Sequence, residues 1–300
     1  MTRTAAATAA ALLLALSLSA CGDDKDHADH ASESAPTSGT SNMPGMSSGT
    51  SGMDMSKIGD GMQATVNGYT LTDVKAPSKP DEAGKLSFTV KGPRGVQKDY
   101  TRQQTKLMHV YLVRKDLTGY QHVHPTIDPA SGVWSVDLTI PEPGPYHLVA
   151  EFEALTPDGN FDDRILGTNF TVAGSYKPST AMPAEMNTAS ADGYQLVLDG
   201  SPKVNGGDLK LKITKDGADV TDLEPYLASF AHITGFREGD LTTVHVHPNE
   251  TPKNPDDTTA RGGPTLTISP MFSETGHYRL FIQFQTAGVV HLATMDLMVA

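Results

Sequence analysis

The sequence is nearly free of cysteine. Cys21 is the only one in 300 residues, so no disulfide can form within one chain and the folded part must be stabilised by core burial. Basic residues are also scarce: 23 Lys and Arg stand against 35 Asp and Glu, which gives a formal net charge of −12. This balance argues against nucleic acid as a partner and against electrostatic attraction to anionic lipid headgroups, and it leaves room for cations.

The common catalytic motifs are missing as well. The sequence has no Gly-x-Ser-x-Gly elbow, no phosphate-binding glycine loop and no obvious pair of catalytic carboxylates. We therefore expect a protein that is not an enzyme. Its hydrophobic content of 38% suffices for two cores of ordinary domain size.

The one long apolar run lies at the start of the chain. Arg3 precedes a stretch of Ala and Leu that is too short for a stable membrane-spanning helix but typical of a signal peptide. It ends in Leu18-Ser19-Ala20-Cys21, which resembles the lipobox of bacterial lipoproteins. The resemblance implies that residues 1–20 are a signal peptide and that lipid on Cys21 anchors the exported chain at the outer face of the cell membrane. An ordinary cleaved signal with an incidental cysteine is the alternative.

Residues 21–61 have a different composition. They are rich in Ser, Gly, Asp, Thr and Met and contain no aromatic residue. Such a segment cannot bury enough apolar surface to offset its chain entropy, so we expect a flexible tether. Its soft thioethers and imidazoles could collect Cu(I), and the weaker candidate ligands are His27, His30, Met43, Met46, Met53 and Met55. A solvated spacer that happens to contain methionine is the alternative.

The rest of the chain repeats itself. Gly68-Tyr69-Thr70-Leu71 is echoed by Gly193-Tyr194-Gln195-Leu196, and the tetrapeptide His-Val-His-Pro occurs at 122–125 and again at 245–248. In each copy another histidine lies 13 residues before this tetrapeptide, since 122 − 109 and 245 − 232 both equal 13. These ordered identities predict two tandem domains, at 62–175 and 190–300, with a linker at 176–189.

Short alternating segments fill both domains. Apolar and polar residues alternate from Leu86 to Val90 and again from Leu209 to Ile213, which predicts half-buried strands, and Gly, Pro and Asp turns separate such segments. We therefore predict an all-β fold of two tandem immunoglobulin-like β-sandwiches. The motif Glu-x-Gly-x-Tyr-x-Leu, at 142–148 and 274–280, resembles the tyrosine corner of these sandwiches, with an ordinary strand start as the alternative.

Six histidines recur within this frame. Residues two apart on a strand point to the same side, so both histidines of each His-Val-His-Pro share a face. A connecting loop of even length brings the earlier histidine to the same face, diagonal to the last one. Three neutral imidazoles suit Cu(II), Zn(II) or Ni(II), and the affinity order favours a copper ion, with zinc as the second choice. The candidate ligands are His109, His122 and His124 in the first copy and His232, His245 and His247 in the second.

Part of this frame resembles a known family. Residues His109 to Pro125, with Gly132-Val133-Trp134 and Pro141 to Tyr146, are similar to bacterial secreted proteins and lipoproteins labelled as heavy-metal-binding-domain proteins. The resemblance covers about 65–300 and implies a sandwich fold and a bound metal.

From the sequence we therefore expect a lipoprotein that buffers or delivers copper outside the cytoplasm. Its expected partners are the membrane, through the lipid on Cys21, and a metal-transport or cell-surface protein. The alternative is a cell-surface interaction or structural module in which the histidines form hydrogen bonds within the sandwiches and no ion is involved.

Overall fold

Strands account for nearly all of the regular structure. The computed structural model describes residues 55–179 and 187–300, and within these ranges only α1 (Met55–Ile58) is an α-helix. None of the helical structure in these ranges could span a bilayer. The predicted all-β fold of two tandem β-sandwiches is confirmed, because the strands form two pairs of sheets, one pair in each half of the chain.

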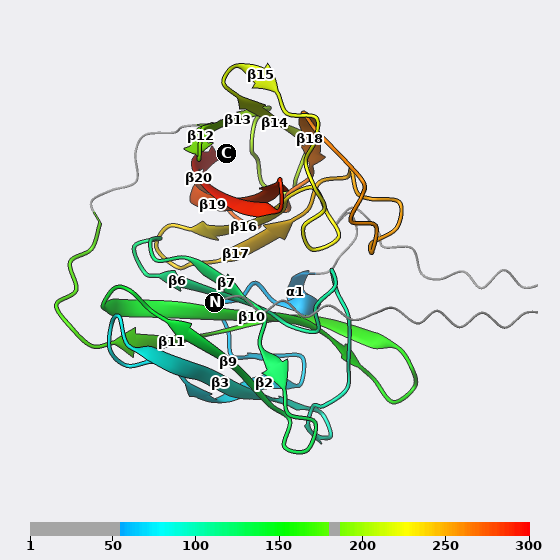
Figure 1. Cartoon of the computed structure of the whole chain (residues 1–300). Coiled ribbons are helices and arrows are strands. Elements are labelled where there is room, and N and C mark those ends of the chain that lie inside the picture. The colour runs from blue at the N-terminus through cyan, green and yellow to red at the C-terminus, as the bar shows by residue number, and fades with distance from the viewer. Residues whose placement is uncertain (1–54, 180–186) are drawn as a thin grey trace, which may run out of the picture. The chain divides into compact units, whose positions relative to one another are not determined.

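The first sandwich consists of two antiparallel sheets, drawn as two layers in Figure 1. One has the order β1-β2-β3-β9-β8, with β4 beside β3, and the other has the order β11-β10-β6-β7, with β5 beside β10. The strands of the first sheet are β1 (Thr65–Val66), β2 (Tyr69–Lys75), β3 (Ala83–Gly92), β4 (Gly95–Val96), β8 (Thr126–Ile127) and β9 (Val133–Thr139). Those of the second are β5 (Tyr100–Thr101), β6 (His109–Arg114), β7 (Gln121–Val123), β10 (Gly144–Leu155) and β11 (Phe161–Val172).

The second sandwich repeats this arrangement. One sheet has the order β12-β13-β14-β15, with β18 also paired to β14, and the other has the order β17-β16-β19-β20. The strands of the first sheet are β12 (Thr188–Ala191), β13 (Tyr194–Asp199), β14 (Leu209–Lys215), β15 (Ala218–Asp219) and β18 (Thr265–Ile268). Those of the second are β16 (His232–Arg237), β17 (Thr243–Val246), β19 (Gly276–Thr286) and β20 (Val289–Val299).

The strand order is that of an immunoglobulin-like sandwich. If β2, β3, β6, β7, β8, β9, β10 and β11 are read as strands A, B, C, C′, D, E, F and G, one sheet has the order A-B-E-D and the other G-F-C-C′. The tyrosine corners are also present: the hydroxyls of Tyr146 and Tyr278 donate hydrogen bonds to the main-chain oxygens of Glu142 and Glu274, each at 3.0 Å. The prediction from the Glu-x-Gly-x-Tyr-x-Leu motif is therefore correct.

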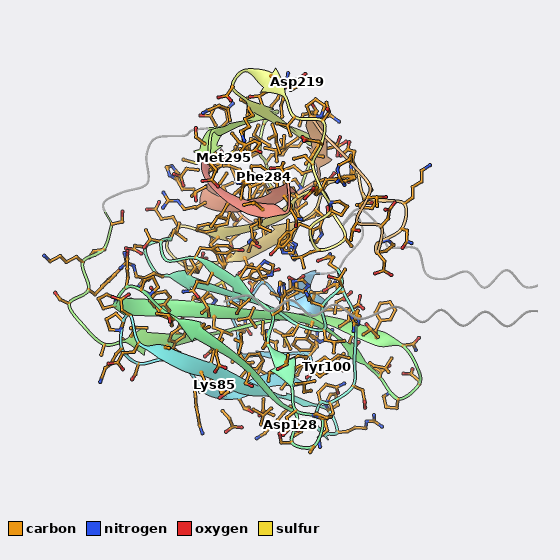
Figure 2. All side chains as sticks on the ribbon, in the orientation of Figure 1. Lys85, Tyr100, Asp128, Asp219, Phe284 and Met295 are labelled. Atoms are coloured by element: carbon orange, nitrogen blue, oxygen red, sulfur yellow. The ribbon has the colours of Figure 1, made fainter. Side chains whose placement is uncertain are left out.

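Each sandwich has its own core, built from the alternating segments. In β13 and β14 every second residue is buried, so apolar side chains enter the core and polar ones face outwards. In the first sandwich the fully buried Trp134 packs at this core beside Tyr100, with ring centroids 4.9 Å apart. Figure 2 shows the contrast at labelled positions, with Phe284 and Met295 inside the second sandwich and Lys85 at the surface of the first.

The two sandwiches also bury a third apolar cluster, which we call the inter-sandwich cluster. The described residues all belong to one compact unit. Its inter-sandwich cluster joins side chains of β6, β10 and β11 to side chains of the second sandwich: Tyr111, Val113, Leu117, Val149, Ile165, Phe236, Leu241 and Phe281, with Ile58 and Tyr120 at its edge. As a result all six residues of β6 are buried, on both faces of the strand.

The folded part begins earlier than the expected end of the tether at Gly61. The main-chain oxygen of Asp60 accepts a hydrogen bond from the Thr243 nitrogen at 2.9 Å, and that of Gly61 accepts one from Nε2 of His147 at 2.8 Å. Ile58 packs against the inter-sandwich cluster. Composition alone suggested a solvated segment, but these few residues gain main-chain hydrogen bonds to both sandwiches, which offset the entropy of ordering them.

Candidate metal centre

Two equivalent hairpins carry the six predicted histidines. His109 and His232 are the first residues of β6 and β16, His122 and His245 lie in β7 and β17, and the last histidine of each copy directly follows its strand. Tyr111 pairs with His122 in the first hairpin, as Thr234 does with His245 in the second. The antiparallel register then brings the first and last histidines of each hairpin directly opposite each other. The predicted diagonal placement is wrong, because the turn sets a register that differs from the expected one by two residues.

The six imidazoles form one continuous cluster across both sandwiches. The ring centroid of His122 lies 4.5 Å from that of His124 and 4.6 Å from that of His232, which belongs to the other sandwich. His232 in turn lies 4.4 Å from His245 and 4.8 Å from His247. Both outer faces that meet here carry histidine, so the contact between sandwiches joins the two predicted triads into a single site, which we call the histidine centre.

Two groups of nitrogens converge closely enough to share an ion. One nitrogen from each of His232, His245 and His247 lies within 4.8 Å of the others, which is the triad predicted for the second copy. The other group is His109, His122 and His232, so His232 replaces His124. The ring of His124 still packs at 4.9 Å from that of His109, but its buried Nε2 has no hydrogen-bond partner among the described residues.

The acidic residue of the centre was not predicted from the sequence. Glu151, on β10, accepts a hydrogen bond from Nδ1 of His245 at 2.6 Å and another from the hydroxyl of Tyr111 at 3.1 Å. The same hydroxyl lies 3.1 Å from Nε2 of His232. Glu151 therefore reaches from the first sandwich to a histidine of the second, in the arrangement by which carboxylates orient metal-binding imidazoles.

Glutamine side chains contact the remaining histidines. Gln283, on β19, accepts a hydrogen bond from Nδ1 of His122 at 2.7 Å, and the amide nitrogen of Gln104 donates to Nδ1 of His247 at 3.0 Å. In addition, Nε2 of His109 donates to the main-chain oxygen of Gln103 at 3.0 Å. Both glutamine side chains cross from one sandwich to the other, so the centre is fixed by residues of both.

Burial keeps the centre neutral. Desolvation lowers the pKa of His109 to about 4 and that of His124 to about 3, against an ordinary value of 6.5. Burial, reinforced by the neighbouring imidazoles, also places the pKa values of His122, His232 and His247 well below that value. At neutral pH these rings therefore carry lone pairs, the form that binds metal ions.

Glu151 is the exception to this neutrality. Burial alone would raise the pKa of its carboxyl, but His245, His109 and the Tyr111 hydroxyl more than compensate, so the pKa lies below its ordinary 4.5. The carboxylate is therefore ionised and negative at neutral pH. It places one formal negative charge beside the imidazoles.

One pattern in the sequence could have revealed Glu151. In β10 the core residues are Tyr146, Leu148, Ala150 and Phe152, so the residues between them face outwards. Glu151 is nevertheless only 8% exposed. Its register partner on β6 is His109, so a strand pairing of β6 with β10 would have placed it on the histidine face.

The other described histidines have different partners. Nε2 of His147 donates to the main-chain oxygen of Gly61, and His291 hydrogen-bonds to Asp192 and Thr286. His277 lies 3.9 Å from a carboxylate oxygen of Glu238. Of the predicted tether ligands and the lipidation site, Cys21, His27, His30, Met43, Met46 and Met53 lie outside the described residues, and Met55 is the first residue of α1.

The chain belongs to a family described as a domain of unknown function (DUF8832), whose profile matches residues 64–161 and 189–300. No curated protein matches the chain. The matched segments lie one in each sandwich, so the family spans both halves of the histidine centre.

Several solved structures resemble the chain distantly. The Escherichia coli adhesin FdeC is 15% identical, over 81% of this chain and 67% of that one, with a TM-score of 0.24. A Salmonella alpha-2-macroglobulin is 12% identical over 82% of this chain, which spans only 16% of that protein's length, with a TM-score of 0.24. The fibronectin(III)-like modules of Clostridium thermocellum CbhA are 10% identical over 77% of this chain and 92% of that one, with a TM-score of 0.18. These TM-scores are too low to carry an argument about function.

Proposed function

We propose that this protein is a metal-binding lipoprotein of the cell envelope that buffers or delivers a transition metal, copper in the first place and zinc in the second. The observation that carries the proposal is the gathering of six imidazoles, two of them fully buried, in one cluster between the sandwiches. Removing so many polar rings from water costs free energy. Metal binding accounts for this arrangement, because imidazole is a strong ligand for copper and zinc.

The nitrogens that face each other support this proposal. Nδ1 of His109 lies 3.1 Å from Nε2 of His122, while the other nitrogen of each ring donates to an oxygen of Gln103 or Gln283. A neutral imidazole has one N–H, so in this arrangement both facing nitrogens carry lone pairs. Two ligands about 2.0–2.1 Å from a tetrahedral ion are roughly 3.3 Å apart, close to the spacing found here.

The choice of copper follows from affinity order. Among divalent first-row ions, sites made of nitrogen ligands bind copper most strongly, and exported proteins meet ions without the buffering of the cytoplasm. The role we propose needs binding and release alone, and is not enzymatic. The expected partners are a metal-transport or cell-surface protein and the membrane, through the lipid on Cys21.

Calorimetric titration of the full chain with Cu(II) and Zn(II) tests the proposal. A variant in which His122, His124, His245 and His247 are all changed to Ala is expected to lose at least a hundredfold in affinity, because each group then retains too few ligands. The matched control is His277→Ala, which removes a histidine outside the centre and is expected to leave affinity unchanged. Equal affinity in the quadruple variant and the wild type would refute metal binding at this site.

A second candidate function is a cell-surface interaction or structural module without metal. The observation that favours it is that most of these histidines already hydrogen-bond to the protein, as His122 does to Gln283 and His247 to Gln104. In that case the same quadruple variant would have a lower melting temperature and unchanged metal uptake. The two readouts therefore separate the candidates.

A further inference from the structure

Glu151 and Gln283 occupy equivalent positions in the two sandwiches. Glu151 on β10 pairs with His109, and Gln283 on β19 pairs with His232, which is the equivalent histidine of the second copy. Each side chain then crosses to the opposite sandwich. There it contacts Nδ1 of the first histidine of His-Val-His-Pro, His245 for Glu151 and His122 for Gln283.

The two contacts differ in how firmly they fix the position of the proton on the histidine ring. An ionised carboxylate only accepts hydrogen bonds, so Glu151 holds a proton of His245 on Nδ1, the arrangement in which Nε2 faces a metal ion. An amide both donates and accepts. If the Gln283 amide turns by half a rotation, its nitrogen donates to Nδ1 of His122, whose Nε2–H can then donate to Nδ1 of His109.

The charge of Glu151 also favours a divalent ion in the half of the centre that contains His245. A divalent ion held by neutral imidazoles leaves two positive charges in a buried site, which is costly. Beside Glu151 one of these charges is neutralised, and beside Gln283 neither is. Hydrogen bonds with glutamine do not separate the halves, because Nε2 of His247 lies 3.0 Å from Nδ1 of His232 and Gln104 contacts His247 as Gln283 contacts His122. The half that contains His232, His245 and His247 differs in its carboxylate, which orients His245 and balances part of the charge of a divalent ion.

We propose that Glu151 determines which half of the histidine centre holds a divalent ion, so that one tight ion binds at His232, His245 and His247, on the side of the centre that carries the carboxylate. This inference rests on the proposed metal-binding function. Glu151 acts as a positioning and charge-balancing residue through His245.

Exchange of the two side chains tests the proposal, with Zn(II) as the probe because it is redox-inactive. Calorimetry and metal analysis of the full chain are expected to find one tight zinc ion. Glu151→Gln should weaken this site at least tenfold, and Gln283→Glu should create a second tight site. In the wild type, His245→Ala should abolish tight binding, whereas His122→Ala should cost less than threefold.

The double exchange Glu151→Gln with Gln283→Glu gives the sharpest readout. It keeps the composition of the centre, and it should retain one tight zinc ion whose binding now depends on His122 rather than on His245. A merely structural role of Glu151 would not transfer this dependence from one histidine to the other. Melting temperatures and circular dichroism of each variant show whether it is folded.

Three outcomes would overturn the inference: unchanged affinity in folded Glu151→Gln, no second site in Gln283→Glu, or a double exchange whose zinc still depends on His245. If Glu151→Gln does not fold, the stoichiometry of Gln283→Glu alone decides between one and two tight ions. Failure of the proposed function looks different, because zinc affinity would then be unaffected by the quadruple histidine variant.

Discussion

Among single residues, Tyr111 connects the charged and neutral parts of the histidine centre. Its buried hydroxyl donates to Glu151 and lies within hydrogen-bonding distance of His232. Changing Tyr111 to Phe removes one donor from a buried carboxylate, so we expect the free energy of unfolding to fall by about 1–3 kcal/mol. Urea unfolding of the ion-free protein measures this loss.

The control for Tyr111→Phe is Tyr176→Phe. Tyr176 is half-buried beside the guanidinium of Arg114, 5.5 Å from the ring centroid, and away from the centre. Its hydroxyl is expected to contribute little. Equal losses in the two variants would show that Tyr111 has no special place in the network.

At this scale the sequence predicted the histidines but not the residues that orient them. A repeated His-Val-His-Pro is visible because two copies coincide, and all six predicted histidines of the folded part lie in the centre. Tyr111, Glu151 and Gln283 lack such a signal, since each lies in a strand with no repeated polar motif. Their role depends on contact between sandwiches, which spacing along one chain does not encode.

Among the structural elements, the two tyrosine corners make matched contributions. Gly144 and Gly276 precede the tyrosines with φ values of 136° and 132°, a conformation that strongly favours glycine, and the tyrosine then hydrogen-bonds back to the residue four before it. Tyr146→Phe and Tyr278→Phe should each lower the free energy of unfolding by about 1 kcal/mol, because each loses one hydrogen bond. Denaturant midpoints test this.

The corner variants are expected to lose stability but to keep the metal affinity of the wild type. Both corners lie at the start of the F-equivalent strand, so neither substitution removes a residue of the histidine centre. Zinc and copper affinities should remain as in the wild type. A corner variant that lost metal binding while it remained folded would contradict the separation of the corners from the centre.

The elements were largely predictable, and the register was not. Alternation predicted strands at Leu86 to Val90 and at Leu209 to Ile213, and both lie in β3 and β14. The hairpins were also expected, but a two-residue difference in register decides whether two histidines on one face are opposite or diagonal, and the turn geometry sets that difference. Loop length alone was insufficient to derive it.

For the whole molecule, the contact between sandwiches is the feature that assembles the centre. Phe281, on β19, stacks on Tyr120 of the first sandwich, with ring centroids 4.1 Å apart and planes at 5°. Phe281→Ala should lower the free energy of unfolding by about 3–5 kcal/mol. It should also weaken metal binding, although no histidine is changed, because Glu151 of the first sandwich contacts His245 of the second.

The control for Phe281→Ala is Val290→Ala on the neighbouring strand β20. Val290 is 40% exposed and does not belong to the inter-sandwich cluster. Calorimetry should find wild-type affinity in this variant. Unchanged metal affinity in a folded Phe281→Ala would indicate that binding does not depend on the contact between the sandwiches.

Acidification should destabilise the ion-free protein. The folded-state pKa values of His109, His122, His124, His232 and His247 lie below the ordinary 6.5, so the unfolded chain binds more protons than the folded one below that pH. Stability is therefore greatest above about pH 6.5 and falls towards pH 4, by up to about 1.4 kcal/mol per pH unit for each histidine.

Urea midpoints at pH 7.5 and pH 5 measure this dependence. The quadruple histidine variant is the comparison, because it lacks three of the five shifted groups and should lose less stability on acidification. The same loss in both proteins would mean that other groups cause it.

The packing of the outer faces was the part of the fold that the sequence did not predict. Alternation predicts one buried face for each strand, and β6 is buried on both, because its second face meets the other sandwich. Two separate three-histidine patches were therefore expected, and the contact merges them into one centre.

Anomalous diffraction at the copper or zinc edge, from crystals of the full chain grown with the ion, tests the proposed metal binding at this centre most directly. We predict a peak between the sandwiches, at about 2 Å from ring nitrogens of His232, His245 and His247. A folded protein whose histidine centre shows no peak at saturating metal, or whose peaks lie only at other residues, would contradict it.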